Sequence, residues 1–379
     1  MNPSEIREYF GGRVPAMIDA IREIVDIESP TGNAERNAAV IEWTEKHLSS
    51  INADIEIEKI DAAENGSHLI IRAFRSASPA VLILGHTDTV HPLGTNKENP
   101  TRIDGDSFFG CGVFDMKANI VAVFEAVRFF ADHKIESVLP INILLSCDEE
   151  IGSPSGREYV ESEAAKAKFC LVCEPSADGM VKTGRKGTAM YYLAAHGISS
   201  HAGLEPEKGA NAVVELSRHI DAIQALNDPE KGTTVNVCTI SGGTATNVIP
   251  EFAKFSIDVR FKTTAEAERV DAVIRSIKPH DRRVSLEVTG GINRPPLERT
   301  NGVAELFAKA RDFAESFGYS IDETQVGGAS DGNFVGALGV PVLDGVGIRG
   351  SGAHTLKEHI NISDIADRTT LITLILAGK

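Results

Sequence analysis

The sequence predicts an α/β protein in which a mixed-sheet α/β domain is interrupted by a smaller, ferredoxin-like domain of the split βαβ type. Three observations support this. The 379 residues are 42% hydrophobic and 24% charged, a globular composition in a chain too long for one small core. Strands alternate with helices in the first half of the chain. After Gly187 the order of elements changes, and it changes back after Pro296.

The first part of the chain has the periodicity of a layered α/β domain. Apolar residues recur at helical spacing, and runs of β-type residues follow them. The expected helices are 3–27, 33–48 and 116–131, and the expected strands are 55–60, 68–74, 80–84, 141–146 and 169–173.

A second domain is expected between Gly187 and Asn293. Its predicted elements are strand 188–195, helix 210–226, strands 234–240 and 254–261, helix 265–277 and strand 284–288. This is the split βαβ order. A helix at 303–317 and a strand at 341–343 then resume the first pattern, so we expect residues 1–186 and 294–379 to form one domain, with 187–293 inserted.

The charge balance excludes some partners. The chain has 54 acidic and 38 basic residues, a formal charge of -16, which repels nucleic-acid phosphates and anionic lipids. No apolar run approaches the roughly 20 residues of a membrane-spanning helix. The first residues include Glu5 and Glu8 and show no apolar signal core, so we expect no nucleic-acid or membrane partner and a cytoplasmic location.

The five cysteines do not indicate a disulfide framework, because their number is odd and the chain is large. Cys170 and Cys173 form a C-x-x-C within an apolar strand-like run. Because no second pair completes a four-thiolate site, we interpret them as inert buried thiols.

Histidines and carboxylates follow several of the apolar strands, where the active sites of open α/β sheets form. In LILGHTD, His86 and Asp88 are expected to point the same way, because side chains alternate along a strand. His86 can then bind a metal while Asp88 orients its second ring nitrogen. Taken alone, a strand end with a hydrogen-bonded His explains this motif equally well.

In GCGVFDMK, two glycines indicate a tight backbone path that leads to Asp115. A dinucleotide-binding loop is excluded, because Asp115 replaces the third glycine of G-x-G-x-x-G and no strand leads directly into the turn. Without the other motifs, Asp115 could equally be the N-cap of the following helix.

Three consecutive acids, Asp148, Glu149 and Glu150, follow the apolar run INILL. Such charges are costly at a strand end unless a cation neutralises them. Adjacent side chains point to different sides, so one of Glu149 and Glu150 can bind a metal while the other acts as general base on a water. The alternative is a solvated acidic turn, the commoner meaning of such a run.

Two further motifs complete the set. Glu174 follows another apolar strand, and His354 lies in the glycine-rich segment GSGAHTLKE. Together the five motifs supply two histidines and three or four carboxylates. This mixed set of nitrogen and oxygen ligands suits divalent ions such as zinc.

In combination, the strings GHTDTV, GVFDMK, CDEEIGS, CEPS and SSHAG, with the late His354, resemble the zinc-dependent metallopeptidase family of glutamate carboxypeptidases, acetylornithine deacetylases, succinyl-diaminopimelate desuccinylases and aminoacylases. The resemblance extends from about Val81 to the C-terminus. It implies a hydrolase that cleaves an amide or peptide bond next to a carboxylate-bearing amino acid, a carboxypeptidase or, alternatively, an N-acyl-amino-acid deacylase. Its substrate would be a small peptide or an N-acyl amino acid.

The resemblance also implies two zinc ions per chain, which cobalt or manganese could replace in vitro. Its metal ligands would be Asp115 between the two ions, His86 and Glu174 on one, and Glu150 and His354 on the other. Asp88 would orient His86, Glu149 would be the general base, and the peptide between Asp115 and Met116 would be cis. Ala118 and Met116 depart from the pattern of some branches of the family, which leaves the branch open.

The inserted domain resembles the family's dimerisation domain, so a homodimer is expected. His201 resembles the histidine that reaches the partner subunit's active site, although a lone surface His is the ordinary reading. Asn247 and Arg260 resemble substrate-contacting positions. Arg260 and the pair Arg185-Lys186 can bind a substrate carboxylate or form internal ion pairs. A metal-binding protein without catalysis is disfavoured, because Glu149 accompanies all five ligands.

Overall fold

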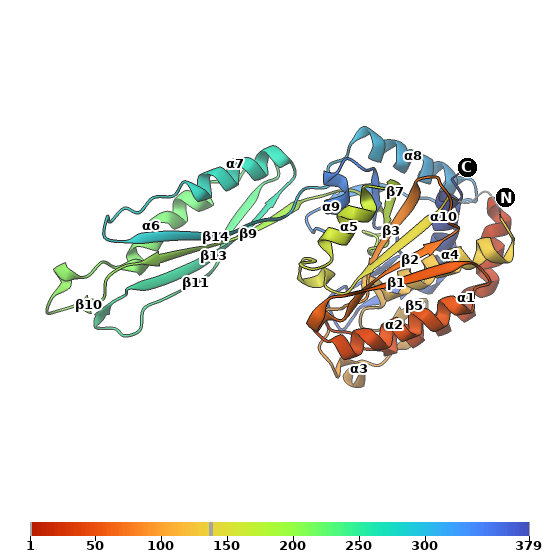
Figure 1. The fold of residues 1–379 in the computed structure, drawn as a ribbon, viewed down its shortest axis with the longest axis horizontal. Helices are drawn as coiled ribbons and strands as arrows, with labels where there is room; N and C mark the ends of the chain where they lie inside the picture. Colours follow the sequence, from red (N-terminus) through yellow and green to blue (C-terminus); the bar gives the residue numbers. More distant parts are fainter. Residues whose placement is uncertain (1, 136–138, 379) are drawn as a thin grey trace. The chain divides into compact units, whose positions relative to one another are not determined.

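The computed structural model describes residues 2–135 and 139–378, which form two compact units (Figure 1). The first unit contains the described residues up to Gly184, together with Arg299–Val326 and the described residues from Ser330 onward. The second unit contains Arg185–Glu298 and Gly327–Ala329. Each unit has its own hydrophobic core.

Within the described residues, eight strands of the first unit form one mixed sheet in the order β1-β2-β6-β3-β7-β16-β8-β15. They are β1 (Ile55–Asp61), β2 (Ser67–Ala73), β3 (Ala80–His86), β6 (Ile141–Ser146), β7 (Ala167–Val172), β8 (Val181–Arg185), β15 (Glu323–Val326) and β16 (Val342–Asp344). The central strands β6, β3, β7 and β16 are parallel, whereas β1, β2 and β8 run antiparallel to their neighbours. The mixed α/β sheet predicted from the sequence is therefore present.

Helices cover both faces of this sheet (Figure 1). The helices are α1 (Pro3–Asp26), α2 (Ala34–Ser49), α4 (Ala118–Asp132), α5 (Arg157–Ala164), α8 (Asn301–Glu315), α9 (Gly332–Ala337) and α10 (Ile365–Ala377), with the short α3 (Thr95–Glu98). α1, α4 and α10 pack on one another over one face, and α5 and α9 pack over β7 on the other. Strands buried on both faces read as continuous apolar runs, which explains the sequence VLIL of β3.

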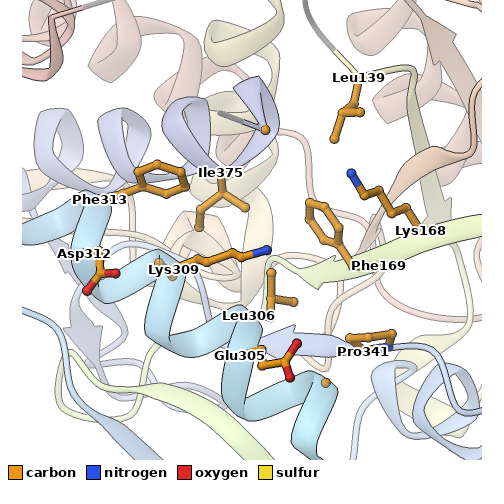
Figure 2. A pocket seen from close by; sticks show the side chains of 13 residues that line it. Leu139, Lys168, Phe169, Glu305, Leu306, Lys309, Asp312, Phe313, Pro341 and Ile375 are labelled. Carbon is orange, nitrogen blue, oxygen red and sulfur yellow. The ribbon is translucent and has the colours of Figure 1, made fainter.

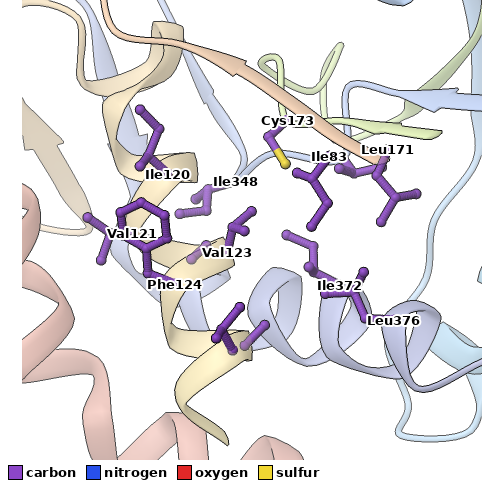
Figure 3. Close-up of a cluster of buried hydrophobic side chains, with 14 of the residues drawn as sticks. Ile83, Ile120, Val121, Val123, Phe124, Leu171, Cys173, Ile348, Ile372 and Leu376 are labelled. Atoms are coloured by element: carbon purple, nitrogen blue, oxygen red, sulfur yellow. The ribbon is translucent and has the colours of Figure 1, made fainter. Parts of the chain in front are cut away.

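The core between the sheet, α4 and α10 is shown in Figure 3. Ile83 and Cys173 reach toward Phe124 of α4 and Ile372 of α10. Cys173 and Cys170 are buried and free, which confirms that they form no disulfide. Burial raises the pKa of both thiols, so they stay protonated.

The second unit is a four-stranded antiparallel sheet in the order β11-β13-β9-β14 with two helices. Its elements in chain order are β9 (Gly187–His196), α6 (Ala212–Gln224), β11 (Thr234–Gly242), β13 (Phe252–Phe261), α7 (Thr264–Arg275) and β14 (Ser285–Arg294). A small ribbon joins β10 (Ser200–His201) to β12 (Val248–Ile249). Along β9, buried Tyr191 and Leu193 alternate with exposed Met190 and Tyr192, so one face of the sheet holds the core and the other is open.

Two features near the predicted site differ from the sequence-based expectation. The helix expected from residue 116 begins at Ala118, because an irregular turn, Val113–Lys117, precedes it. This turn contains a cis peptide between Asp115 and Met116, as expected. A small sheet in the order β17-β18-β5-β4 was also not expected from the sequence; it is formed by β4 (Arg102–Asp104), β5 (Ser107–Phe109), β17 (Gly350–Ser351) and β18 (His359–Asn361).

In the part of the chain that the structure describes, no helix is long and apolar enough to cross a membrane.

Candidate metal centre

The parallel strands of the first unit bring the predicted motifs to one edge of the sheet. His86 is the last residue of β3 and pairs with Ser146, the last residue of β6. Glu149 and Glu150 follow β6 in a short turn, and Glu174 follows β7. Because the carboxyl ends of parallel strands meet at the same edge, residues far apart in the sequence come together there.

Asp115 lies between two histidines. Its Oδ1 is 3.1 Å from Nε2 of His86, and its Oδ2 is 3.3 Å from Nε2 of His354. Each carboxylate oxygen therefore faces a different imidazole. A carboxylate in this position can place one oxygen on each of two cations.

The remaining acids complete two sides of this cluster. Glu174 Oε1 lies 3.7 Å from Nε2 of His86, and Glu150 Oε2 lies 3.3 Å from Nε2 of His354. Ligand atoms of His86, Glu149 and Glu174 lie within 4.8 Å of one another, and so do those of His86, Asp115 and Glu150. The structure thus brings Glu149 and all five predicted ligands into one cluster.

The charges in the cluster shift the pKa values of its members. Hydrogen bonds to Asp115 and Glu150 raise the pKa of His354 to about 10. Burial alone would raise the pKa of Asp115, but hydrogen bonds from His354 and His86 hold it well below its usual range. Burial opposes the charged form of His86, yet hydrogen bonds to Asp115 and Asp88 raise its pKa well above the ordinary value. The crowded carboxylates therefore draw positive charge to this edge of the sheet.

The residues present fit divalent cations. Imidazole nitrogens and carboxylate oxygens are the ligand types of zinc. Oε1 of Glu150 is buried and, among the described residues, has no hydrogen-bond partner. Such an oxygen carries a free-energy penalty that a coordinated cation removes.

Asp88 contacts His86 through both its backbone and its carboxylate. β3 ends at His86, so Asp88 lies just beyond the strand, yet its side chain reaches the second ring nitrogen of His86 as expected. The carbonyl oxygen of Asp88 lies 2.9 Å from Nδ1 of His86, and its carboxylate Oδ1 lies 3.4 Å from the same nitrogen. The carboxylate also accepts hydrogen bonds from Thr31 and from the backbone N–H groups of Glu149 and Glu150. Asp88 therefore connects His86 to the acidic turn.

Glu358 holds the turn that carries Asp115, and sequence reasoning missed it. Its buried carboxylate accepts hydrogen bonds of 2.9 Å from the backbone N–H groups of Gly112, Phe114 and Asp115, and it lies 2.7 Å from Nε2 of His91. These hydrogen bonds fix the backbone of the turn that contains Asp115. No pattern in the sequence distinguishes Glu358 from a surface glutamate.

Asp115 is not a helix cap, so that alternative is wrong. α4 begins at Ala118, and its N-cap is Lys117. Lys117 is buried, and its Nζ donates a 2.6 Å hydrogen bond to the carbonyl of Ile27. Burial lowers the pKa of Lys117 to about 7. The turn is therefore held at both ends, by Glu358 and by Lys117.

His201 and Asn247 belong to the second unit. His201 is exposed at the end of β10, and its Nδ1 accepts hydrogen bonds of 3.1 Å from the N–H groups of Gly203 and Leu204. Asn247 lies in the adjoining segment, where its carbonyl accepts from the N–H of Ala202. The two predicted residues are neighbours on the β10–β12 ribbon.

Arg260 also lies in the second unit, on β13, and it has an internal partner. Its Nε and Nη2 donate to both carboxylate oxygens of Asp258, at 3.0 and 2.9 Å. Burial, followed by the charges of Lys262 and Arg260, lowers the pKa of Lys186, so these three cations are close enough to interact. Arg185 donates to the carbonyl oxygens of Gly328 and Ala329.

A cavity of about 420 Å³ lies elsewhere in the first unit (Figure 2). It is near the amino end of β7, at the sheet edge opposite the carboxylate cluster. Its walls are mostly apolar, with Lys168 and Lys309 pointing into it; they include Phe169, Leu306, Phe313 and Ile375. The described residues that line this cavity include no histidine, so the cluster at the carboxyl edge is the better candidate for chemistry.

A carboxylate between two histidines, among further acids at one edge of a mixed α/β sheet, is a ligand set of the kind that metal-dependent hydrolases use. The comparisons with known proteins give the family. A model of the peptidase family M20/M25/M40 matches residues 82–377, and the chain belongs to this family. The resemblance found in the sequence is therefore confirmed, and the protein is a hydrolase of a metal-dependent family.

Relatives named for different activities are similar to this chain. Carboxypeptidase G2 of Pseudomonas sp. (strain RS-16) is 29% identical, over 96% of this chain and 90% of the relative. Succinyl-diaminopimelate desuccinylase of Hydrogenovibrio crunogenus is 27% identical, over 95% and 99%. The crystal structure of aminopeptidase PepT from Bacillus cereus matches with a TM-score of 0.74 at 21% identity, covering 96% of this chain and 98% of that one, and shows the shared fold.

We predict that Glu358→Gln weakens metal binding. In the wild type both carboxylate oxygens of Glu358 accept hydrogen bonds from backbone N–H groups, whereas in the variant one oxygen is replaced by an NH₂ group, which cannot accept them. Loss of partners that support metal ligands typically costs roughly 10- to 100-fold in metal affinity. Titration against a competing chelator measures the affinity, with exposed Glu158→Gln as the matched control. Unchanged affinity in Glu358→Gln would show that the turn holds Asp115 without this carboxylate.

Proposed function

We propose that the protein is a two-zinc carboxypeptidase, glutamate carboxypeptidase-like, that cleaves the amide bond next to a carboxylate-bearing amino acid. The observation that carries this proposal is the Asp115 carboxylate, whose two oxygens face His86 and His354. The similarity to carboxypeptidase G2 supports this activity. The similarity to the desuccinylase supports the alternative, an N-acyl-amino-acid deacylase such as acetylornithine deacetylase or succinyl-diaminopimelate desuccinylase.

The five ligands fall into two sets that share Asp115. His86 and Glu174 would hold one ion, and Glu150 and His354 the other, in agreement with the distances from Nε2 of each histidine. When bound, two zinc ions supply Lewis acidity and lower the pKa of a water toward neutrality. Glu150 Oε1, buried and without a hydrogen-bond partner among the described residues, is available to its ion.

Glu149 is the proposed general base. It is next to Glu150 in the turn after β6, and its carboxylate lies within 4.8 Å of the ligand atoms of His86 and Glu174. It is therefore close to the ligands proposed for one ion and adjacent in sequence to Glu150, a ligand proposed for the other, without being needed to complete either set. Glu149 would take the proton of the attacking water and return it to the leaving amine, and Asp88 would fix its backbone.

Arg260 is the proposed partner of the substrate carboxylate. A guanidinium has five N–H donors, and Asp258 engages only Nε and Nη2, so the remaining donors can bind a second carboxylate. The charges of Lys186 and Lys262 add to the attraction for an anion. Asn247, on the neighbouring ribbon, is a second proposed substrate contact.

His201 is the proposed donor to the oxyanion that develops during cleavage. Because two backbone N–H groups donate to Nδ1, the neutral imidazole carries its hydrogen on Nε2, which is then free to donate. We propose that the second unit is a dimerisation domain and that His201 acts in the partner subunit's site. A cytoplasmic location remains a prediction.

The activity is tested with purified, zinc-loaded protein and a panel of peptides and N-acyl amino acids. We predict hydrolysis of substrates whose released amino acid has a free α-carboxylate, and no hydrolysis of the matching α-amides. Glu149→Gln should lose roughly 10² to 10⁴ in kcat, the usual cost of removing a general base, while keeping both metals.

Glu150→Gln is the matched control, since it changes the adjacent acid in the same way. It should bind less metal than Glu149→Gln, because Glu150 is a proposed ligand. If Glu149→Gln lost a metal and Glu150→Gln did not, the two roles would have to be exchanged. Equal turnover of the α-amides would contradict recognition of a carboxylate.

The role of His201 across subunits is tested by mixing two inactive variants. His201→Ala and Glu149→Ala homodimers should each be nearly inactive. In a mixed dimer, intact His201 from the Glu149→Ala chain meets intact Glu149 of the other chain, and one site is whole. Random exchange makes about half of the dimers mixed, so roughly a quarter of wild-type activity should return.

The control mixes His201→Ala with the double variant His201→Ala, Glu149→Ala, which contains no intact His201. It should recover nothing. Recovery is also absent if His201 acts within its own chain, so demonstrated subunit exchange without recovered activity excludes the cross-subunit role.

A further inference from the structure

We propose that Glu215, His219 and His280 form a transition-metal site built entirely from residues of the second unit. Ligand atoms of these three side chains lie within 4.8 Å of one another. The proposed hydrolase reaction uses none of them. The site would therefore bind a metal in addition to any ion held at the cluster around Asp115.

Helix geometry brings the first two ligands together. Glu215 and His219 are four residues apart on α6, so their side chains lie on the same face, one turn apart. His219 Nε2 is 3.0 Å from Glu215 Oε1. Both residues are buried, with 1% and 6% exposure, which fixes the pair against the body of the unit.

Backbone hydrogen bonds orient the carboxylate. Glu215 Oε1 accepts from the N–H of His280 at 2.6 Å, and Oε2 accepts from the N–H of Asp281 at 3.1 Å. These bonds tie α6 to the segment that follows α7, from which the third ligand comes. Arg218 also lies near this carboxylate, with Nη1 at 4.0 Å from Oε2, but its side chain is 52% exposed and can move into solvent.

His280 provides access from solvent. Its ring centroid lies 4.8 Å from that of His219, with an angle of 32° between the rings. His280 is exposed, and no hydrogen bond to its ring nitrogens is recorded among the described residues. Two imidazoles brought this close can turn one nitrogen each toward a common ion.

The ligand chemistry selects the class of ion. Two imidazoles and one carboxylate are a three-ligand set of the kind that binds zinc while leaving a position for water. Imidazole suits zinc, nickel and copper, whereas calcium and magnesium prefer sets made entirely of oxygen. The expected ligand is therefore Zn²⁺ or a similar transition-metal ion.

Bound metal would link two segments that are far apart in the sequence, α6 and the connection between α7 and β14. Because the metal binds the folded unit and not the separated ligands of the unfolded chain, it should stabilise this unit. This consequence can be measured without any assay of hydrolysis.

The test is equilibrium dialysis of the full chain against micromolar Zn²⁺, followed by measurement of metal content. His280→Ala and His219→Gln should each bind one zinc fewer than wild type, whatever the total, with hydrolysis of the best substrate unchanged. His196→Ala is the matched control, because His196 is an exposed histidine of the same unit with one acidic neighbour, Glu287, at 3.6 Å. It should bind as much zinc as wild type.

A second readout covers the case in which a variant folds poorly. Zn²⁺ should raise the melting temperature of the Glu149→Gln, Asp115→Asn variant, in which the other cluster is impaired, and His280→Ala in the same background should abolish the shift. Ca²⁺ should have no effect. Equal zinc content in wild type and His280→Ala, or the same loss in His196→Ala, would overturn the proposal.

Discussion

The mutual repulsion of carboxylates at one edge of the sheet is the constraint on which the rest of the site depends. Asp115, Glu149, Glu150 and Glu174 meet there around two imidazoles. Such a group is stable only if positive charge enters it. Hydrogen bonds to Asp115 and Glu150 raise the pKa of His354 to about 10, so the cluster favours the protonated, positively charged form of this imidazole. Divalent cations would supply positive charge with neutral imidazoles as ligands.

Hydrogen bonds from neighbouring residues hold these acids in place. Glu358 fixes the turn that carries Asp115 through three backbone N–H groups. Asp88 joins His86 to the backbone of the acidic turn after β6. Asp331 accepts hydrogen bonds from Ser146 and Ser153, which lie on either side of that turn, and so links its two ends. Three further carboxylates are therefore used to position the four that form the cluster.

Much of this site could be predicted from the sequence, because its parts are strand ends. The apolar run before His86 identifies a buried strand, and parallel strands bring their carboxyl ends together. The prediction failed where local pattern carries no signal. Asp88 lies two residues beyond the end of β3, where strand alternation does not apply, although its carboxylate does lie 3.4 Å from Nδ1 of His86. The start of α4 was placed at Met116, because helical periodicity cannot reveal the irregular turn before it.

Other features depend on contacts between distant segments. Glu358 lies more than 240 residues from the backbone that it holds, so its role is invisible in a local motif. The sequence allows two kinds of partner for Arg260, a substrate carboxylate or an acidic side chain of the protein itself. It does not single out Asp258, with which Arg260 forms an ion pair. The family resemblance supplied the division of ligands between two ions, which spacing alone does not give.

The most direct measurement of the central claim is anomalous diffraction at the zinc absorption edge from crystals of the zinc-loaded protein. If Asp115 lies between two ions as proposed, two peaks are expected next to it, one within coordination distance of His86 and Glu174 and the other of Glu150 and His354, each roughly 2.0 to 2.2 Å from its ligand atoms. A single peak, or two peaks without Asp115 between them, would contradict the bridging role of this carboxylate.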